Sequence, residues 1–236
     1  MSSHLISWNK VITTAMRMPM VKVNREEFLR SAFSGYAHGM TFDNVSPRER
    51  FSQEMLDRVA KATINGHLIK VTALSAAAGI PGGFALLGTL PADTAQYYWH
   101  VLTLAQELGY IYGWPDMLDG QGNMTQETKN ILTIFVGVMM GAQAANKAIA
   151  KIAADIAQEA ATRIASQALT KTTYYPIVRE VAKWIGAKLT KESFAKSAAK
   201  AVPILGAVVS GSITAVTYRT MAMRLMKELR DAILSM

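Results

Sequence analysis

The chain has 236 residues, of which half are hydrophobic and 18% are charged, and its mean hydropathy is only slightly positive. This balance excludes an intrinsically disordered chain, which combines low hydrophobicity with high charge, and is low for a chain made mostly of membrane spans. Cysteine is absent, which excludes disulfide bonds and thiolate metal sites. The first residues lack the basic start and unbroken apolar run of a signal peptide, so we expect a cytoplasmic protein.

The net charge of +8 is concentrated towards one end of the chain. Residues 1–140 carry 11 Lys/Arg and 11 Asp/Glu, whereas residues 141–236 carry 14 and 6. A basic region of this kind favours an acidic partner, either an anionic membrane face or nucleic acid. The basic residues are not interleaved with aromatic ones and match no known DNA or RNA module, so we do not expect a nucleic-acid partner.

Helix signals begin at the start of the chain, and the alternating β-branched runs that are typical of strands are lacking. A first amphipathic helix is predicted over about 5–18 and stops at Pro19. A second begins at Asn24, which opens a sequence of capping-box form. The third is predicted to begin at Ser46-Pro47-Arg48-Glu49, with Ser at N-cap, Pro at N1 and Glu at N3, and to break near Pro81.

The remaining elements are also predicted to be helical. Pro91 opens a helix that ends near 113, and a loop follows at 119–123. Residues from about 125 to 169 form one long helix in which we expect a kink near Gly137 or Gly141. A shorter helix is predicted over about 175–189.

Thr190 is predicted to cap the next helix, which Pro203 interrupts, and the last helix runs from about 204 to the end. The sequence therefore predicts an all-α fold, a single helical domain with close-packed glycine- and alanine-rich central helices.

Three segments of the chain carry no charge: residues 71–92, 130–146 and 201–218, with 22, 17 and 18 residues. A membrane span needs roughly 20 apolar residues, so all three are borderline in length. A break at Pro81 would divide the first segment into two pieces of about 15 Å, which is half a bilayer at most. We interpret the three segments as a buried helical core, with insertion into a membrane in at least one state as the alternative.

Small residues within these segments permit close contact between helices, in membranes and in water-exposed bundles alike. They are predicted to be architectural: Gly82 and Gly83 after Pro81, Gly137 and Gly141, and Gly206 and Gly211 after Pro203. Self-association through such faces, as a homo-oligomer, is left open.

Asp93, His100 and Glu107 share one face of the helix that Pro91 opens. A functional interpretation makes them a metal or acid–base set. However, positions seven apart lie about 10.5 Å apart along a helix, whereas the ligands of one zinc ion lie about 2 Å from it. We therefore treat them as weak catalytic candidates and expect an ordinary solvated polar face.

Other catalytic and cofactor motifs are missing from the sequence. Residues 119–123 resemble the start of a calcium loop but lack its acidic set and its final Glu. No phosphate-binding loop, no HExxH and no GxSxG nucleophile is present. The sequence thus favours a non-catalytic protein without a cofactor or metal.

The final predicted helix is clearly amphipathic. Its apolar side carries Met221, Leu225 and Leu229, and its basic side carries Arg219, Arg224, Lys227 and Arg230. A basic face on anionic lipid is stabilised by about 1 kcal/mol per basic residue near the surface. The alternative is the ordinary solvated face of a core helix.

Two stretches of the sequence resemble the EcsC protein family: GIPGGFALLGTLPAD at 79–93 and AVPILGAVVSGSITAVTYR at 201–219. The resemblance extends over about 71–115 and 195–232. It implies a bacterial helical protein, named from an operon that encodes an ABC transporter, with an EcsC-like domain at 46–236 after an N-terminal helical extension at 1–45. It brings no enzymatic activity. The motif positions are those of turns, helix starts and close packing: Pro81, Gly82, Gly83, Pro91, Asp93, Pro203, Gly206, Thr217 and Arg219.

Taken together, these features lead us to expect a non-catalytic helical protein at the cytoplasmic membrane face. It would associate peripherally through its apolar segments and basic C-terminal part, and act on lipids or a membrane protein partner as an accessory or effector. One alternative is a membrane-inserting toxin or defence effector that depolarises cells. Another is a hydrolase that uses Asp93, His100 and Glu107.

Overall fold

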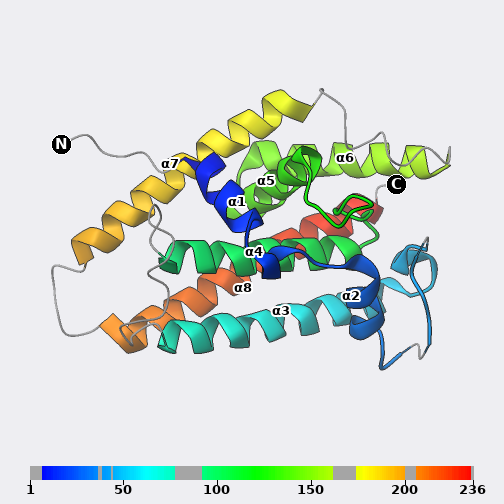
Figure 1. The fold of residues 1–236 in the computed structure, drawn as a ribbon, viewed down its shortest axis with the longest axis horizontal. Coiled ribbons are helices and arrows are strands. Elements are labelled where there is room, and N and C mark those ends of the chain that lie inside the picture. Colours follow the sequence, from blue (N-terminus) through cyan, green and yellow to red (C-terminus); the bar gives the residue numbers. More distant parts are fainter. Residues whose placement is uncertain are drawn as a thin grey trace.

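The computed structural model describes residues 7–36, 39–43, 45–77, 92–161, 174–199 and 206–234. Over these residues the chain forms one bundle of α-helices without a strand, which confirms the predicted all-α, single-domain fold (Figure 1). The helices are α1 (Trp8–Met16), α2 (Arg25–Ala32), α3 (Gln53–Ala77), α4 (Ala92–Ile111), α5 (Gln126–Met140), α6 (Gln143–Ala161), α7 (Tyr175–Ala199) and α8 (Gly206–Leu234), with short 3-10 helices η1 (Pro19–Val21) and η2 (Pro47–Glu49).

Helix α5 forms the centre of the bundle. All residues from Ile131 to Met140 are buried, and the helix packs against α4, α6, α7 and α8. A hydrogen bond joins α1 to the middle of α5, in which Trp8 Nε1 donates to Thr133 Oγ1 at 3.1 Å. Residues 131–140 of the uncharged segment are therefore buried on all sides of the helix, as predicted for a core element.

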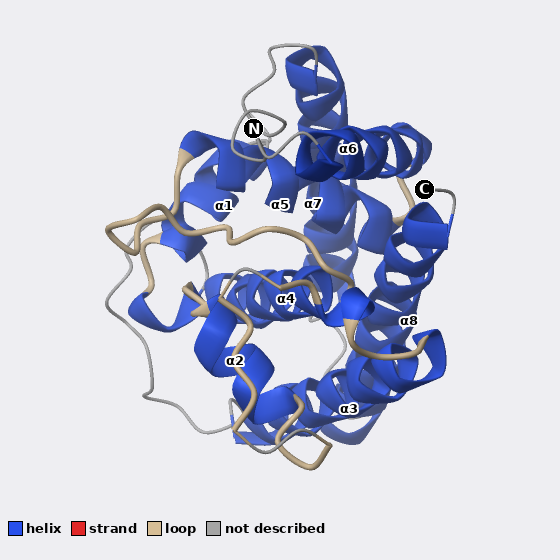
Figure 2. Cartoon of the chain, turned by 90° about the vertical axis from the view of Figure 1, so that its right-hand side faces the viewer, coloured by secondary structure: helices blue, strands red, loops and turns tan. Residues whose placement is uncertain are grey.

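The helices of the bundle lie in two groups. Figure 2 shows α1, α5, α6 and α7 in an upper group, α2, α3 and α4 in a lower one, and α8 along one side. Helices α3 and α8 pack against each other and against α4. In Figure 1, α3 ends at the same end of the bundle at which α4 and α8 begin. No helix among the described residues combines the length and apolar character needed to cross a bilayer.

The predicted long helix over 125–169 is two helices rather than one kinked helix. Gly141 follows α5 in the left-handed region, with φ of +86°, which ends the helix and lets α6 begin at Gln143. Two cations lie at this carbonyl end of α5: Lys188 Nζ donates to Met140 O at 2.7 Å, and the Arg224 guanidinium lies against Gly141. Positive charge at a helix C-terminus is stabilising.

Two of the predicted helix boundaries are wrong. The motif at Ser46 opens only the 3-10 turn η2, in which Glu49 Oε1 accepts from the Ser46 N–H at 3.1 Å. The long helix α3 begins later, after Ser52, whose Oγ accepts from the Met55 N–H. Helix α7 continues through Thr190 to Ala199, because no Gly or Pro interrupts this stretch and its Lys, Glu and Ala residues favour a helix.

The N-terminal residues belong to the same hydrophobic core as the rest of the chain. Trp8 and Phe33 lie in one cluster of buried residues with members from every later helix. The wholly buried Gln106 of α4 binds the backbone of the first segment, with Nε2 donating to Val21 O and Oε1 accepting from the Val23 N–H. The domain boundary at residue 45 stays a prediction, and in space its two sides share this core.

Gly137 sets how closely α6 and α7 approach α5. A Cβ at this position would overlap the γ-methyl group of Val181 and lie 2.8 Å from the Ala145 Cβ. We therefore expect Gly137→Ala to lower the free energy of unfolding by about 1–3 kcal/mol, the usual cost of overfilling a packed core. Urea denaturation with a fixed m-value measures this change.

Gly66→Ala in α3 is the matched control, since a Cβ there would meet nothing within 4 Å. It should leave stability unchanged or raise it by up to about 1 kcal/mol, because alanine favours a helix over glycine. Equal effects of the two substitutions would contradict a close approach at Gly137.

Candidate functional site

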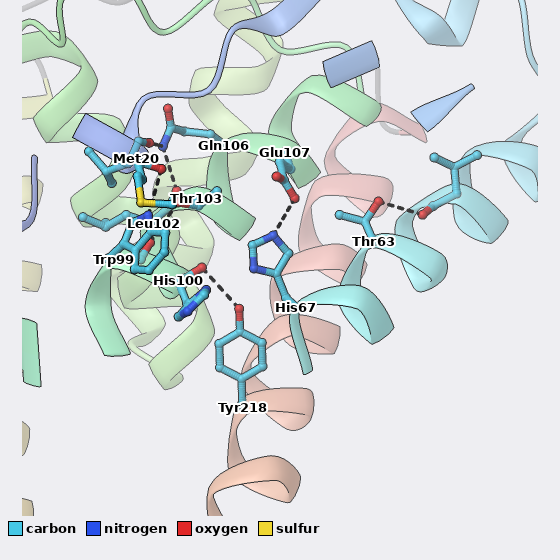
Figure 3. A network of polar contacts seen from close by, with 12 residues as sticks. Met20, Thr63, His67, Trp99, His100, Leu102, Thr103, Gln106, Glu107 and Tyr218 are labelled. Atoms are coloured by element: carbon cyan, nitrogen blue, oxygen red, sulfur yellow. Dashed lines mark hydrogen bonds and ion pairs between the residues drawn. The ribbon is translucent and has the colours of Figure 1, made fainter. Parts of the chain in front are cut away.

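The sequence-predicted site residues His100 and Glu107 lie in a buried polar cluster where α3, α4 and α8 meet (Figure 3). Their partners are His67 from α3 and Tyr218 from α8. His67 is 5% exposed, His100 4% and Tyr218 0%. At His100 the polar face of α4 is covered by α8 and α3.

The cluster is held by two polar contacts across helices. His67 Nε2 and Glu107 Oε2 are 2.8 Å apart, which joins α3 to α4. Tyr218 Oη donates to the backbone carbonyl of His100 at 3.2 Å, which joins α8 to α4. The two imidazole rings meet edge to face, with centroids 5.9 Å apart.

His100 is held as a neutral imidazole. Neither of its ring nitrogens has a hydrogen-bond partner among the described residues. Its pKa is lowered to about 4, chiefly by burial, with His67 and Lys70 acting in the same direction. Burial likewise raises the pKa of Tyr218, with Tyr97 and Glu107 acting in the same sense.

The geometry of the cluster suits a structural role rather than catalysis. Both imidazoles are about 95% buried, so a substrate arriving from solvent could not reach them. Within the described part of the chain, no three His, Cys, Asp or Glu side chains are grouped so as to hold a metal ion. Asp93 lies in the first turn of α4, at a position whose side chain is outside the described set.

Sequence reasoning missed His67, because the residue belongs to no catalytic or metal-binding motif. A signal for it exists in the spacing of α3. Its buried positions include Leu56, Val59, Ile64 and Val71, and His67 falls in the same helical stripe. A histidine in an otherwise apolar stripe needs a polar partner when it is buried, and Glu107 is that partner here.

The predicted basic face of α8 is only partly free. Arg219, Arg224 and Lys227 are exposed. Arg230 is instead half-buried and ion-paired, at 3.6 Å from Asp57 and 3.0 Å from Asp231. Two apolar side chains are also exposed on this helix, Val216 at 67% and Met223 at 36%.

Of the predicted architectural residues, the structure describes Gly137 and Gly141 in full. Gly137 lies in close contact with α6 and α7, and Gly141 ends α5 rather than kinking a longer helix. Gly206 begins α8 and Gly211 lies in its first turns, at positions whose contacts are outside the described set. The remaining ones lie outside the described residues: Pro81, Gly82, Gly83, Pro91 and Pro203.

Comparison of the chain with protein-family models, with curated proteins and with solved structures finds no match. The resemblance to the EcsC family therefore stays a prediction. Within the wider regions of the resemblance, 71–115 and 195–232, helix α4 packs against α8. Tyr97 Oη lies 3.4 Å from Met221 Sδ, beside the contact of Tyr218 with His100.

Buried His100 makes the protein sensitive to acid. The unfolded chain protonates this imidazole near pH 6.5 and the folded chain only near pH 4, so the unfolded state binds more protons between these values. The free energy of unfolding should therefore rise with pH over this window, by about 3 kcal/mol in total. Chemical denaturation from pH 4 to pH 7 measures the slope.

His100→Leu should flatten this slope, because the titrating group is removed while the side chain stays apolar. Tyr218→Phe is the control, since it deletes only the hydroxyl that contacts the His100 carbonyl and should keep the slope. An unchanged slope in His100→Leu would show that another group governs the acid sensitivity.

Proposed function

We propose that the protein is a non-catalytic, EcsC-like helical protein that associates peripherally with the cytoplasmic face of a membrane and acts there as an accessory or effector. The observation that carries the proposal is the outer face of α8. There, three exposed cations, Arg219, Arg224 and Lys227, accompany the exposed apolar side chains of Val216 and Met223. Basic and apolar groups on one exposed helix face are typical of helices that lie on anionic lipid.

The charge distribution supports a surface contact of this kind. All of the net positive charge comes from residues 141–236. Arg230 is not counted among the proposed lipid contacts, because Asp57 and Asp231 neutralise it. At about 1 kcal/mol per basic residue near an anionic surface, the three exposed cations would together give a substantial attraction.

The core position of α5 favours association over insertion. The segment 130–146 holds the bundle together, and bringing it into contact with lipid would break the packing of α5 on α6, α7 and α8. The proposal therefore assigns the membrane contact to outer faces of the bundle, and keeps α5 inside it.

Vesicle flotation tests the proposal. The purified chain should float with vesicles rich in anionic lipid, float less with neutral vesicles, and be released as salt is raised, because the attraction is screened. Replacing Arg219, Arg224 and Lys227 by Gln together should weaken binding to anionic vesicles by at least tenfold.

A charge-matched control replaces Lys10, Arg17 and Arg30 by Gln, since these are also exposed but belong to the N-terminal part. This variant should bind nearly as well as the original chain. Equal loss in both variants would show that net charge alone drives binding, and absence of binding to either vesicle would refute the proposed function.

A further inference from the structure

Helix α3 exposes an apolar side chain in an outward stripe of its own. Arg58, Ala62, Asn65 and Ile69 follow one another at spacings of four, three and four residues, and all are exposed. Ile69 is 71% exposed, more than any other large apolar side chain among the described residues. The cations Lys61 and Lys70 flank this stripe and are exposed as well. A single exposed apolar residue is ordinary, so its neighbours decide whether it matters.

Helix α8 carries a matching stripe. Val216, Thr220, Met223 and Lys227 repeat the same spacing, and all are exposed, with Val216 at 67%. This stripe lies opposite the buried side of α8, on which Tyr218, Leu225 and Leu229 face the core.

The exposed apolar residues of the two stripes lie at one level of the bundle. Helices α3 and α8 pack side by side, and α3 ends where α8 begins (Figure 1). Ile69 lies eight residues before the end of α3 and Val216 lies ten residues after the start of α8. At 1.5 Å per residue, both are about 12–15 Å from the same end of the bundle.

On both helices, a stretch without charged residues ends close to Ile69 or Val216. From Val71 to the end of α3, and from the start of α8 to Tyr218, the sequence contains no charged residue. Lys70 and Arg219 are the first charges beyond these stretches. The exposed Ile69 and Val216 therefore lie close to Lys70 and Arg219 along the chain. This arrangement matches a bilayer surface, since apolar groups enter the acyl boundary while Lys and Arg reach back to the headgroups.

Acidic groups do not offset these cations. Lys61, Lys70, Arg219, Arg224 and Lys227 are exposed on the two helices, as is Arg58. The exposed acids there are Glu54, in the first turn of α3, and Asp231, near the end of α8 and bound to Arg230, both remote from Ile69. Asp57 is turned inward to Tyr112 Oη and Arg230.

We propose that α3 and α8 together form the docking surface for an anionic bilayer, with Ile69 and Val216 entering the headgroup boundary and Lys70 and Arg219 contacting the lipid headgroups. This inference rests on the proposed function and adds α3 to it, a helix outside the basic C-terminal part.

Site-specific fluorescence tests this surface, and the cysteine-free chain allows single labels. Ile69→Cys, Val216→Cys and Met20→Cys each receive an environment-sensitive NBD dye. Met20 is the matched control, because it is 67% exposed and lies on the opposite side of α4 from His67 and Tyr218 (Figure 3). On addition of vesicles of phosphatidylserine and phosphatidylcholine, the emission maximum of the labels at 69 and 216 should shift to the blue and their fluorescence intensity should rise severalfold. The emission of the label at 20 should not change.

A second measurement does not depend on a dye. Replacing Lys61 and Lys70 by Gln should weaken flotation with anionic vesicles by about fivefold per cation, as expected for two cations at the lipid surface. The control variant replaces the exposed pair Lys10 and Arg17 by Gln, and it should float with anionic vesicles almost as well as the original chain.

The outcomes separate the two proposals. If the chain binds vesicles and only the label at 216 responds, α8 docks alone and the two-helix surface is wrong while the proposed function stands. If all three labels respond equally, no orientation exists. A blue-shifted label at 69 without vesicles, together with a dimer by light scattering, would assign this face to self-association instead. Failure of all variants and of the original chain to float would refute the proposed function itself.

Discussion

The burial of α5 on every side is the constraint from which the rest of the architecture follows. A helix without charge from Asn130 onward has no face that prefers water, so other helices must cover all of it. Gly137 allows α6 and α7 to lie close on one side. Gly141 ends the helix in the left-handed conformation, and Lys188 and Arg224 supply positive charge at its carbonyl end.

Helix α8 links this core to the proposed function. Its inner side packs against α3, α4, α5 and α6, while its outer side presents Val216 and the cations Arg219 and Lys227. Because the same helix serves both purposes, its surface is held rigidly with respect to the core. The polar cluster of His67, Glu107 and Tyr218 fixes α3 in place beside it.

Sequence periodicity was sufficient to predict most helices, the core nature of the segment 130–146 and the N-cap at Asn24, whose Oδ1 accepts from the Glu27 N–H. It was insufficient where local signals compete with tertiary contacts. A Ser-Pro motif opens an α-helix or a single 3-10 turn equally well, and only the packing of residues 47–51 decides.

The candidate site shows the same division. His100 and Glu107 were found because they lie on one helix, but their burial and their partner His67 depend on how α3 is placed against α4, which no local pattern encodes. Similarly, the spacing of α8 predicted its basic face, whereas the neutralisation of Arg230 depends on Asp57 of a distant helix.

Hydrogen exchange of the backbone amides in the presence and absence of anionic vesicles tests the central claim most directly. If α5 is the permanent core and membrane contact is made by outer faces, the amides of residues 131–140 should exchange most slowly and remain unchanged when vesicles are added. Loss of protection in α5 on vesicle binding would contradict the account, because it would show that this segment leaves the core to meet the lipid.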